Sequence, residues 1–351
     1  MKRIAVLLAA LILLFGCAMP IEPVGNASIK PIPKLPSLFP EKNATNVSSA
    51  KPLNGTNGSG TGTDHPLEPS IVPRNISDRI DEGQFDLPDP SDSPLLLYAI
   101  SAGNADAILV KKGEFHMLID NGNAGLVDAK LKNMSINRLD VVVATKDSAD
   151  AFSGISQSLD DFAVGELWDN GNAIVSGEYA AMREKARAMG VVIKHPRAGD
   201  HMEIGGLRVY VLNPQGGKQN SNPDNDAIVL KVQNKEFCIM LLNPIVQDWE
   251  NAIITAAGNE SIKCGVMTYF KHGEGRPVPP IAPEKIGPKD AIISVGSNTD
   301  GLPSPTTLAR LSLAGIRVWR TDTNGTIQVA NYGSPSYEVI PEIVQKETDK
   351  R

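Results

Sequence analysis

Four polar side chains follow a strongly apolar run near the middle of the chain. Residues 140–144 read Asp-Val-Val-Val-Ala, and Thr145, Lys146, Ser148 and Asp150 come directly after them. The β-branched run predicts a buried strand that delivers a polar loop to the end of a sheet. Loops at that end of a strand carry the ligand sites of α/β proteins. An ammonium, a hydroxyl and a carboxylate this close together indicate a site for ion pairing or catalysis.

Lys146 and Ser148 can be written as a lysine base and a serine nucleophile, with Asp150 beside them. Their spacing on an irregular loop gives no reason for the amine and the hydroxyl to meet, so we expect no such catalysis. Glycine pairs at 205–206 and 216–217 do not stand between a strand and a helix, as a phosphate loop requires. We interpret both pairs as turns.

The elements that position these side chains alternate between strand and helix from residue 95 to about residue 332. Apolar runs predict strands at 95–100, 107–110, 116–119, 140–144, 191–193, 207–212, 227–232, 237–242, 291–295, 318–320 and from 266 onward. Helical spacing predicts helices at 127–134, 178–189, 247–257 and 306–314. Strands on both sides of the middle helices predict an α/β protein with two sheets and helices outside them.

The loop after residue 144 resembles the metallo-β-lactamase signature, in which Thr-His-x-His-x-Asp-His-x-Gly-Gly holds one or two zinc ions. Thr145, Asp150 and Gly154 match this signature. Lysine, serine and alanine stand where the signature has its three histidines, at Lys146, Ser148 and Ala151.

A narrower resemblance covers residues 95 to 332. The segments 100–107, 118–122, 224–230 and 292–296 are similar, in this order, to segments of the soluble C-terminal domain of ComEC-type DNA-uptake channels, and so is the ending Arg320-Thr321-Asp322. The resemblance implies a four-layer αββα sandwich of the metallo-β-lactamase type over residues 95–335, followed by a charged tail at 336–351.

The same resemblance locates the remaining positions that hold metal in the family, which uses zinc or manganese. Its bridging Asp falls on Pro244, its His-His-Gly on Lys271 and His272 with the glycine after them, and its late Gly-His-Pro-His on a stretch containing Leu302. A catalytic zinc normally has three protein ligands, most of them His. Residues of suitable type near the expected site are Asp120, Asp150, His272 and Asp300. We therefore predict no metal cofactor and no catalytic residue.

Lysines stand at two of the lost histidine positions, which suggests an electrostatic replacement. We hypothesise that Lys146 and Lys271 supply the positive charge that keeps Asp120 and Asp150 together. The alternative is that both lysines point to solvent, as most do. Asp120 also has a structural interpretation, because a carboxylate at a strand end can accept backbone N–H bonds.

The three other histidines of the folded part receive ordinary packing or surface roles. His116 is expected on a strand, His195 beside a proline and His201 in a turn that leads to a strand. Cys238 and Cys264 lie near neighbouring apolar runs. In an oxidising compartment they could form a disulfide, and two buried free thiols are an equally good interpretation.

The first residues indicate export and attachment to a membrane. Lys2 and Arg3 precede an apolar run from 4 to 15 and then Cys17. Residues 1–19 are therefore expected to be a lipoprotein signal peptide with lipid on Cys17, or an uncleaved membrane anchor. Both interpretations place the folded part at the cell membrane, on its extracytoplasmic side.

Residues 20–94 are rich in Pro, Gly, Ser, Thr and Asn and predict a disordered stalk, because they cannot bury enough apolar surface to fold. Asn-x-Ser/Thr triplets in the stalk suggest a glycoprotein, and chance in a low-complexity segment is the alternative. The candidate N-glycosylation sites are Asn26, Asn43, Asn46, Asn54, Asn57 and Asn75.

Composition bounds the function. The 351 residues carry a net charge of -6 and 41% hydrophobic residues, enough for a sizeable core but without an overall basic character. We predict a membrane-tethered, ComEC-like pseudoenzyme that binds a nucleic acid or another anionic ligand and is linked to DNA uptake in competence. The alternatives are an active metal-dependent phosphodiesterase or nuclease with an atypical site, and a structural envelope glycoprotein.

Overall fold

The computed structural model describes residues 93–216, 223–242, 255–257, 261–269, 271–275 and 285–343. The chain divides into two compact units, Met1–Ser77 and Asp78–Arg351, and all described residues belong to the second. Several predictions concern residues outside the described ranges. They are the signal or anchor segment with Cys17, the stalk up to residue 92, most of the helix at 247–257, Pro244, and the candidate glycosylation sites Asn26, Asn43, Asn46, Asn54, Asn57 and Asn75.

The first sheet has eight strands in the order β15-β14-β1-β2-β3-β4-β5-β6. Its strands are β1 (Leu95–Ala99), β2 (Ile108–Lys112), β3 (Phe115–Ile119), β4 (Arg138–Ala144), β5 (Ala163–Asp169), β6 (Val192–Lys194), β14 (Ile327–Asn331) and β15 (Tyr337–Pro341). β3, β4, β5 and β6 run parallel to one another, whereas β3 is antiparallel to β2. The last four residues of β4 are all buried, as expected for an interior parallel strand covered on both faces.

The second sheet has seven strands in the order β13-β12-β11-β10-β9-β8-β7. Its strands are β7 (His201–Ile204), β8 (Leu207–Asn213), β9 (Val229–Asn234), β10 (Phe237–Leu241), β11 (Val266–Tyr269), β12 (Asp290–Ile293) and β13 (Arg317–Arg320). β10 to β13 are parallel, so their carboxyl ends share one edge of the sheet.

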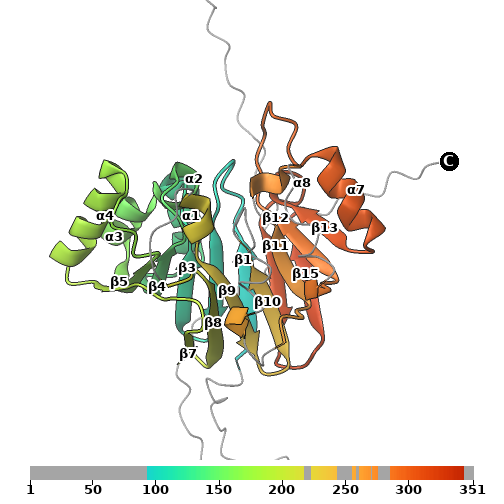
Figure 1. The fold of residues 1–351 in the computed structure, drawn as a ribbon, viewed down its shortest axis with the longest axis horizontal. Helices are drawn as coiled ribbons and strands as arrows, with labels where there is room; N and C mark the ends of the chain where they lie inside the picture. The colour runs from blue at the N-terminus through green and yellow to red at the C-terminus, as the bar shows by residue number, and fades with distance from the viewer. Residues whose placement is uncertain are drawn as a thin grey trace, which may run out of the picture. The chain divides into compact units, whose positions relative to one another are not determined.

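Helices cover the outer faces of both sheets (Figure 1). They are α1 (Ala124–Asn133), α2 (Ala149–Phe152), α3 (Ile155–Asp161), α4 (Gly177–Ala188), α7 (Pro305–Leu313) and α8 (Thr321–Asn324). Side-chain caps explain where the longer helices begin. Asn123, Ser176 and Ser304 each accept a backbone N–H from the first turn of α1, α4 and α7. Pro305 occupies the first turn of α7, where its missing N–H costs nothing.

Three apolar layers separate the four layers of secondary structure. One lies between the sheets and includes Leu97, Val143 and Ile239. The second joins the first sheet to α1, α3 and α4, and the third joins the second sheet to α7. The αββα sandwich predicted from the sequence is therefore confirmed. Among the described residues, no helix has both the length and the apolar character to cross a membrane.

Several sequence-based boundaries were wrong. His201 was expected in a turn, but it is the first residue of β7. The charged tail was expected from residue 336, but Tyr337–Pro341 forms β15, which pairs with β14 along five residues. β15 alternates between half-buried and exposed residues, and Tyr337 and Val339 pack against the core between the sheets. The strand pattern in the sequence is weak here, because polar residues alternate with apolar ones in β15 and charged residues follow it.

Cys238 and Cys264 form a disulfide, which resolves the two interpretations left open by the sequence. Their Cα atoms are 4.9 Å apart. The bond joins β10 to the residue two positions before β11, its parallel neighbour. A disulfide of this kind persists in an oxidising compartment.

Replacing both cysteines by alanine is expected to lower the free energy of unfolding by about 3 kcal/mol, because the bond closes a loop with a sequence separation of 26. Urea unfolding of the wild type with and without dithiothreitol measures the effect. The reductant should lower the stability of the wild type and leave the double alanine variant unchanged. Equal stability of the oxidised wild type and the variant would contradict this contribution.

Candidate functional site

The candidate site lies where the carboxyl ends of β3, β4, β11 and β12 meet. Lys146 and Asp150 follow β4, His272 follows β11, and Asp106 comes from the loop between β1 and β2. We call Asp106, Lys146, Asp150 and His272 the Lys146 cluster. The first sheet contributes three of its members and the second sheet contributes His272, so the cluster spans both sheets of the sandwich.

Lys146 is the centre of this cluster. Its side chain is only 4% exposed, and its Nζ lies 3.0 Å from Asp150 Oδ2 and 3.9 Å from Asp106 Oδ2. Burial by itself would lower the pKa of this amine, but Asp106 and Asp150 outweigh burial and leave the pKa raised. Lys146 is therefore a buried ammonium with two carboxylate partners.

The two carboxylates respond differently to the shared cation. Burial raises the pKa of Asp106, and the charges of Lys146 and His272 only partly oppose it. Burial alone would also raise the pKa of Asp150, but the charge of Lys146 and the hydrogen bond from Ser148 outweigh it and leave this pKa lowered. Asp150 is thus held in its ionised form, and it forms the tighter pair with Lys146.

The His272 ring is oriented beside the acids of the cluster by a hydrogen bond to the backbone. Its Nδ1 lies 2.7 Å from the Ser294 carbonyl oxygen, so Nδ1 donates a hydrogen bond there. Its Nε2 then faces Asp150, at 3.8 Å from Oδ2. The backbone of His272 has a φ of 51°, in the left-handed region, within the 3-10 turn η4 (Lys271–Gly273). This turn carries the imidazole back toward the end of β12.

Asp120 lies beneath the cluster and has the acceptor role expected of a strand-end carboxylate. Its side chain accepts the Thr145 backbone N–H at 2.8 Å and the Thr145 hydroxyl at 2.7 Å. Burial, with a smaller contribution from Asp106, raises its pKa to about 8. Burial thus favours the neutral form of Asp120, and its two hydrogen bonds tie β3 to the end of β4.

Lys271 does not join Lys146. Its Nζ lies 2.7 Å from Asp224 Oδ2 and its side chain is 36% exposed. Asp224 belongs to the 3-10 turn η3 (Pro223–Asp226). The hypothesis that both lysines stand between Asp120 and Asp150 is therefore wrong for Lys271, which binds a different acid. Lys146 does contact Asp150, but its second partner is Asp106 instead of Asp120.

Ser148 and Ala151 complete the loop after β4. The Ser148 hydroxyl donates to Asp150 Oδ1, while Lys146 contacts the other oxygen of that carboxylate. Ala151 is fully buried, and its carbonyl accepts the Asn121 N–H at 2.7 Å. The contacts of Ser148 and Lys146 converge on the same acid, which is an arrangement for ion pairing rather than for activating a nucleophile.

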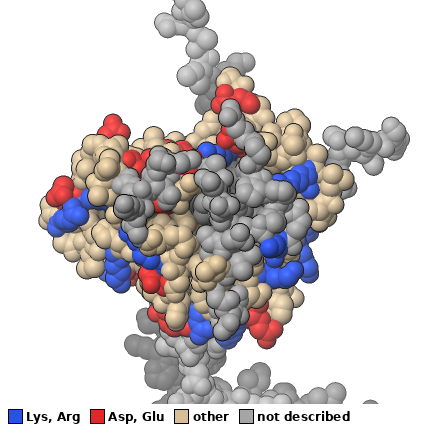
Figure 2. Space-filling view, viewed as in Figure 1, with Lys and Arg blue, Asp and Glu red and all other residues tan. Residues whose placement is uncertain are grey.

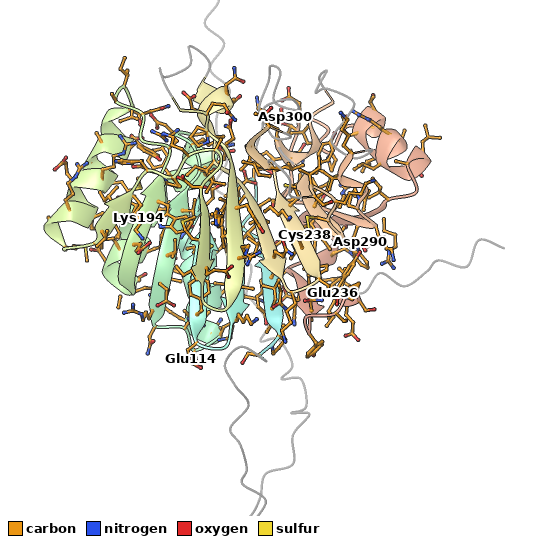
Figure 3. The ribbon with its side chains drawn as sticks, turned by 60° about the horizontal axis from the view of Figure 1, so that its bottom comes forward. Glu114, Lys194, Glu236, Cys238, Asp290 and Asp300 are labelled. Carbon is orange, nitrogen blue, oxygen red and sulfur yellow. A yellow bond between two sulfur atoms is a disulfide. The ribbon has the colours of Figure 1, made fainter. Side chains whose placement is uncertain are left out.

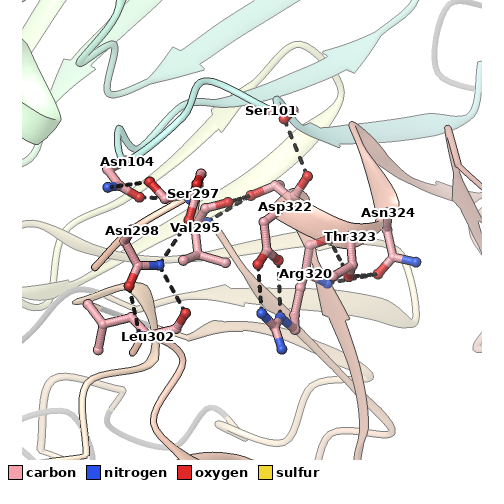
Figure 4. Close-up of polar contacts among 12 residues, drawn as sticks. Ser101, Asn104, Val295, Ser297, Asn298, Leu302, Arg320, Asp322, Thr323 and Asn324 are labelled. Carbon is pink, nitrogen blue, oxygen red and sulfur yellow. Dashed lines mark hydrogen bonds and ion pairs between the residues drawn. The ribbon is translucent and has the colours of Figure 1, made fainter. Parts of the chain in front are cut away.

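Asp300 and Leu302 lie in the loop between β12 and α7. Asp300 is exposed, and Figure 3 shows it at the opposite end of the second sheet from Glu236. Leu302 is half-buried against the core under α7, and its backbone bonds to Asn298 (Figure 4). Neither of these described residues forms an ion pair with the Lys146 cluster, although this loop is on the same side of the sheet.

Neighbouring loops hold the cluster in place. Asn104 accepts the Gly296 N–H at 2.8 Å and donates to the Ser297 carbonyl (Figure 4). The Asp106 N–H donates to the Asp150 carbonyl at 2.8 Å. A Cβ on Gly122 would come within 2.1 Å of the Asp150 carbonyl oxygen, so only glycine allows this approach.

Sequence reasoning missed Asp106, although it lies in a segment that carried the family resemblance. The available signal was a carboxylate in a loop of otherwise small or neutral residues directly after β1.

Sequence reasoning also missed Asp169, an acid that is fully buried at the end of β5. Its two oxygens contact Arg183 Nε at 2.5 Å and His195 Nδ1 at 2.6 Å. His195 is thereby assigned a structural partner.

The residues of the cluster do not fit a zinc or manganese site. Such a site needs three deprotonated ligands around one point. In the described part of the chain, no group of three or more His, Cys, Asp or Glu side chains is arranged to hold a metal ion. The Lys146 ammonium contacts both Asp106 and Asp150 and would repel a divalent cation between them.

The sequence is similar to one part of a known protein of Bacillus subtilis. No protein-family model matches the chain. ComE operon protein 3 of Bacillus subtilis (strain 168) is 32% identical over 146 residues, which are 41% of this chain and 18% of that protein. The matched part is therefore a small share of that relative.

Solved structures similar to this chain are metallo-β-lactamase-fold proteins. YhfI from Bacillus subtilis has a TM-score of 0.49 at 9% identity, over 67% of this chain and 99% of that one. A metal-dependent hydrolase of the β-lactamase superfamily has a TM-score of 0.47 at 12% identity, over 66% of this chain and 98% of that one. The chain has two mixed sheets layered between helices, and it is similar to ComE operon protein 3 over part of its length.

Proposed function

We propose that this chain is a non-catalytic, ComEC-like module of the cell envelope that assists DNA uptake by binding DNA. The observation that carries the non-catalytic part of the proposal is the buried ammonium of Lys146, 3.0 Å from Asp150, and the link to DNA rests on the similarity to ComE operon protein 3. In this proposal a permanent cation replaces the divalent ion that the family uses for hydrolysis, and the fold keeps its shape without the chemistry.

The proposed location is the extracytoplasmic side of the membrane, with the N-terminal segment as a lipid or helical anchor. The Cys238–Cys264 disulfide supports an oxidising compartment, because cytosolic thiols are kept reduced. The apolar run before Cys17 supports export.

The charge of the Lys146 cluster gives no support to an anion site there. Asp106 and Asp150 face a single lysine, and Lys146 is buried between them. A phosphate entering this space would meet carboxylates before it met an unpaired cation. A DNA-binding surface must therefore lie elsewhere on the domain.

An active phosphodiesterase or nuclease is the second candidate, and one observation favours it. Asp106 supplies an additional carboxylate, 4.0 Å from His272 Nδ1, that this candidate needs. Lys146 argues against a nuclease, because its ammonium contacts the same Asp106 carboxylate that would have to bind the metal ion. A structural envelope glycoprotein is the third candidate, and it predicts neither cleavage nor binding of DNA.

Incubation of the full-length chain with labelled single-stranded DNA separates the three candidates. With zinc or manganese supplied, our proposal predicts a salt-dependent mobility shift and no cleavage. Metal-dependent cleavage that chelation abolishes would favour the nuclease. Absence of both cleavage and a shift would favour the structural protein and contradict our proposal.

A further inference from the structure

Exposed cations gather at the end of the second sheet opposite the Lys146 cluster. Lys263 lies just before β11, Lys289 just before β12, and Arg317 is the first residue of β13. All three are exposed, and the Arg317 side chain is 67% exposed. We call these three residues the basic edge. Figure 2 shows several Lys and Arg side chains on the right side of the molecule, with Asp and Glu side chains at the lower right.

The amino ends of β11, β12 and β13 bring the basic edge together. These strands are parallel neighbours in which Val266, Asp290 and Arg317 are paired in one row. The Lys289 N–H donates to the Gly265 carbonyl at 2.9 Å, and the Lys289 carbonyl accepts the Arg317 N–H at 2.9 Å, so Lys289 and Arg317 are neighbours on adjacent strands about 4.8 Å apart. Lys263 lies three residues before Val266, at the same end of the sheet.

Asp290 is the acid at this row, and it is fully buried. It contacts Arg317 Nε at 2.9 Å and accepts hydrogen bonds from the Trp319 indole at 2.8 Å and the Tyr337 hydroxyl at 2.5 Å. These contacts fix the Arg317 side chain, whose guanidinium lies 6.0 Å from the Trp319 ring centroid. Asp290 therefore orients one cation of the edge and does not neutralise the two lysines.

The basic edge differs from the cations on the helices over the first sheet. Lys132 pairs with Asp161, Lys185 with Asp160 and Arg187 with Glu184. Within the described residues, Lys263 and Lys289 have no ion pair with a carboxylate. A chain with a net charge of -6 repels a polyanion on average, so a polyanion approaches best where two lysines without a carboxylate partner among the described residues lie at the same end of the sheet as Arg317.

We propose that the basic edge binds the phosphate backbone of DNA without reading its sequence. The inference rests on the proposed DNA-binding function and names its surface. Phosphate contacts from exposed Lys and Arg give affinity and salt dependence rather than base specificity. The DNA strand then lies across the amino ends of β11, β12 and β13, away from the Lys146 cluster.

The test is a salt titration of binding to a fluorescent single-stranded oligonucleotide by full-length wild type and by Lys263→Ala/Lys289→Ala. Removing two phosphate contacts should weaken binding at least tenfold at low salt and reduce the slope of log affinity against log salt by about 1.4. The matched control is Lys132→Ala/Arg187→Ala, which makes the same change of net charge on the helices of the first sheet. It should bind DNA within about twofold of the wild type, because it removes no proposed phosphate contact.

The outcomes separate this surface from the broader proposal. If the wild type binds DNA and both double variants bind it equally well, the basic edge is refuted while DNA binding stands. If the wild type does not bind DNA, the proposed function itself fails. Wild-type DNA binding with a selective loss of binding to phosphatidylglycerol vesicles in Lys263→Ala/Lys289→Ala would assign the edge to the membrane and overturn our inference.

Discussion

Replacing Lys146 by methionine is expected to lower the free energy of unfolding by about 3–5 kcal/mol. Methionine nearly preserves the volume of the side chain but removes the charge, so the half-buried Asp106 and Asp150 are left beside each other without their cation. Removing one partner of a largely buried ion pair is costly because little solvent is available to stabilise the charges that remain. Urea unfolding at neutral pH measures the change.

Lys271→Met is the matched control, because sequence reasoning gave both lysines the same role. Lys271 is 36% exposed and pairs with Asp224, so its loss should cost about 0–1 kcal/mol. Adding Asp150→Asn to Lys146→Met should restore part of the lost stability by removing the uncompensated carboxylate. Equal effects of the two methionine substitutions would show that Lys146 is not the cation on which the cluster depends.

Replacing Asp120 by asparagine is expected to change how stability depends on pH. Burial and Asp106 raise the pKa of Asp120 from 3.8 to about 8 in the folded chain. Between these values the folded chain keeps a proton that the unfolded chain releases. The stabilisation from Asp120 is thus fully present below about pH 4 and is lost as pH rises toward 8, at about 1.4 kcal/mol per pH unit.

Asparagine cannot ionise but retains an acceptor for the Thr145 N–H. The stability of Asp120→Asn relative to the wild type should therefore rise by several kcal/mol between about pH 4.5 and 7.5. Urea unfolding at several pH values within this range gives the difference directly, and shared contributions from the other acids cancel. A difference that stays constant with pH would mean that Asp120 is ionised throughout.

The fold was predictable because its signal is local and repeated. The run Val141–Ala144 is buried on both faces, and the strand, its loop and the layer order followed from that pattern. β15 was missed because its apolar residues alternate with polar ones and are followed by a charged segment. A short edge strand has a weak pattern of its own, and its pairing with β14 is decided by tertiary contact.

The site was less predictable because ion pairs depend on which loops meet. The Thr145 contact of Asp120 matched the expected acceptor role, since it follows from a strand-end acid. The choice of Asp224 by Lys271, and the arrival of Asp106 beside Lys146, join residues far apart in the sequence. Residue types in the sequence indicated which side chains could belong to the site. Their ion-pair partners depend on how loops from both sheets pack together, which the sequence does not show.

In our proposal the Lys146 ammonium stands in place of a divalent ion. Elemental analysis of the full-length wild type, purified with zinc and manganese supplied and then dialysed against metal-free buffer, tests this claim. We predict less than about 0.1 equivalent of either metal per chain, because the two acids nearest His272 are already bound to an internal cation. Close to one equivalent of tightly held zinc or manganese would contradict the account.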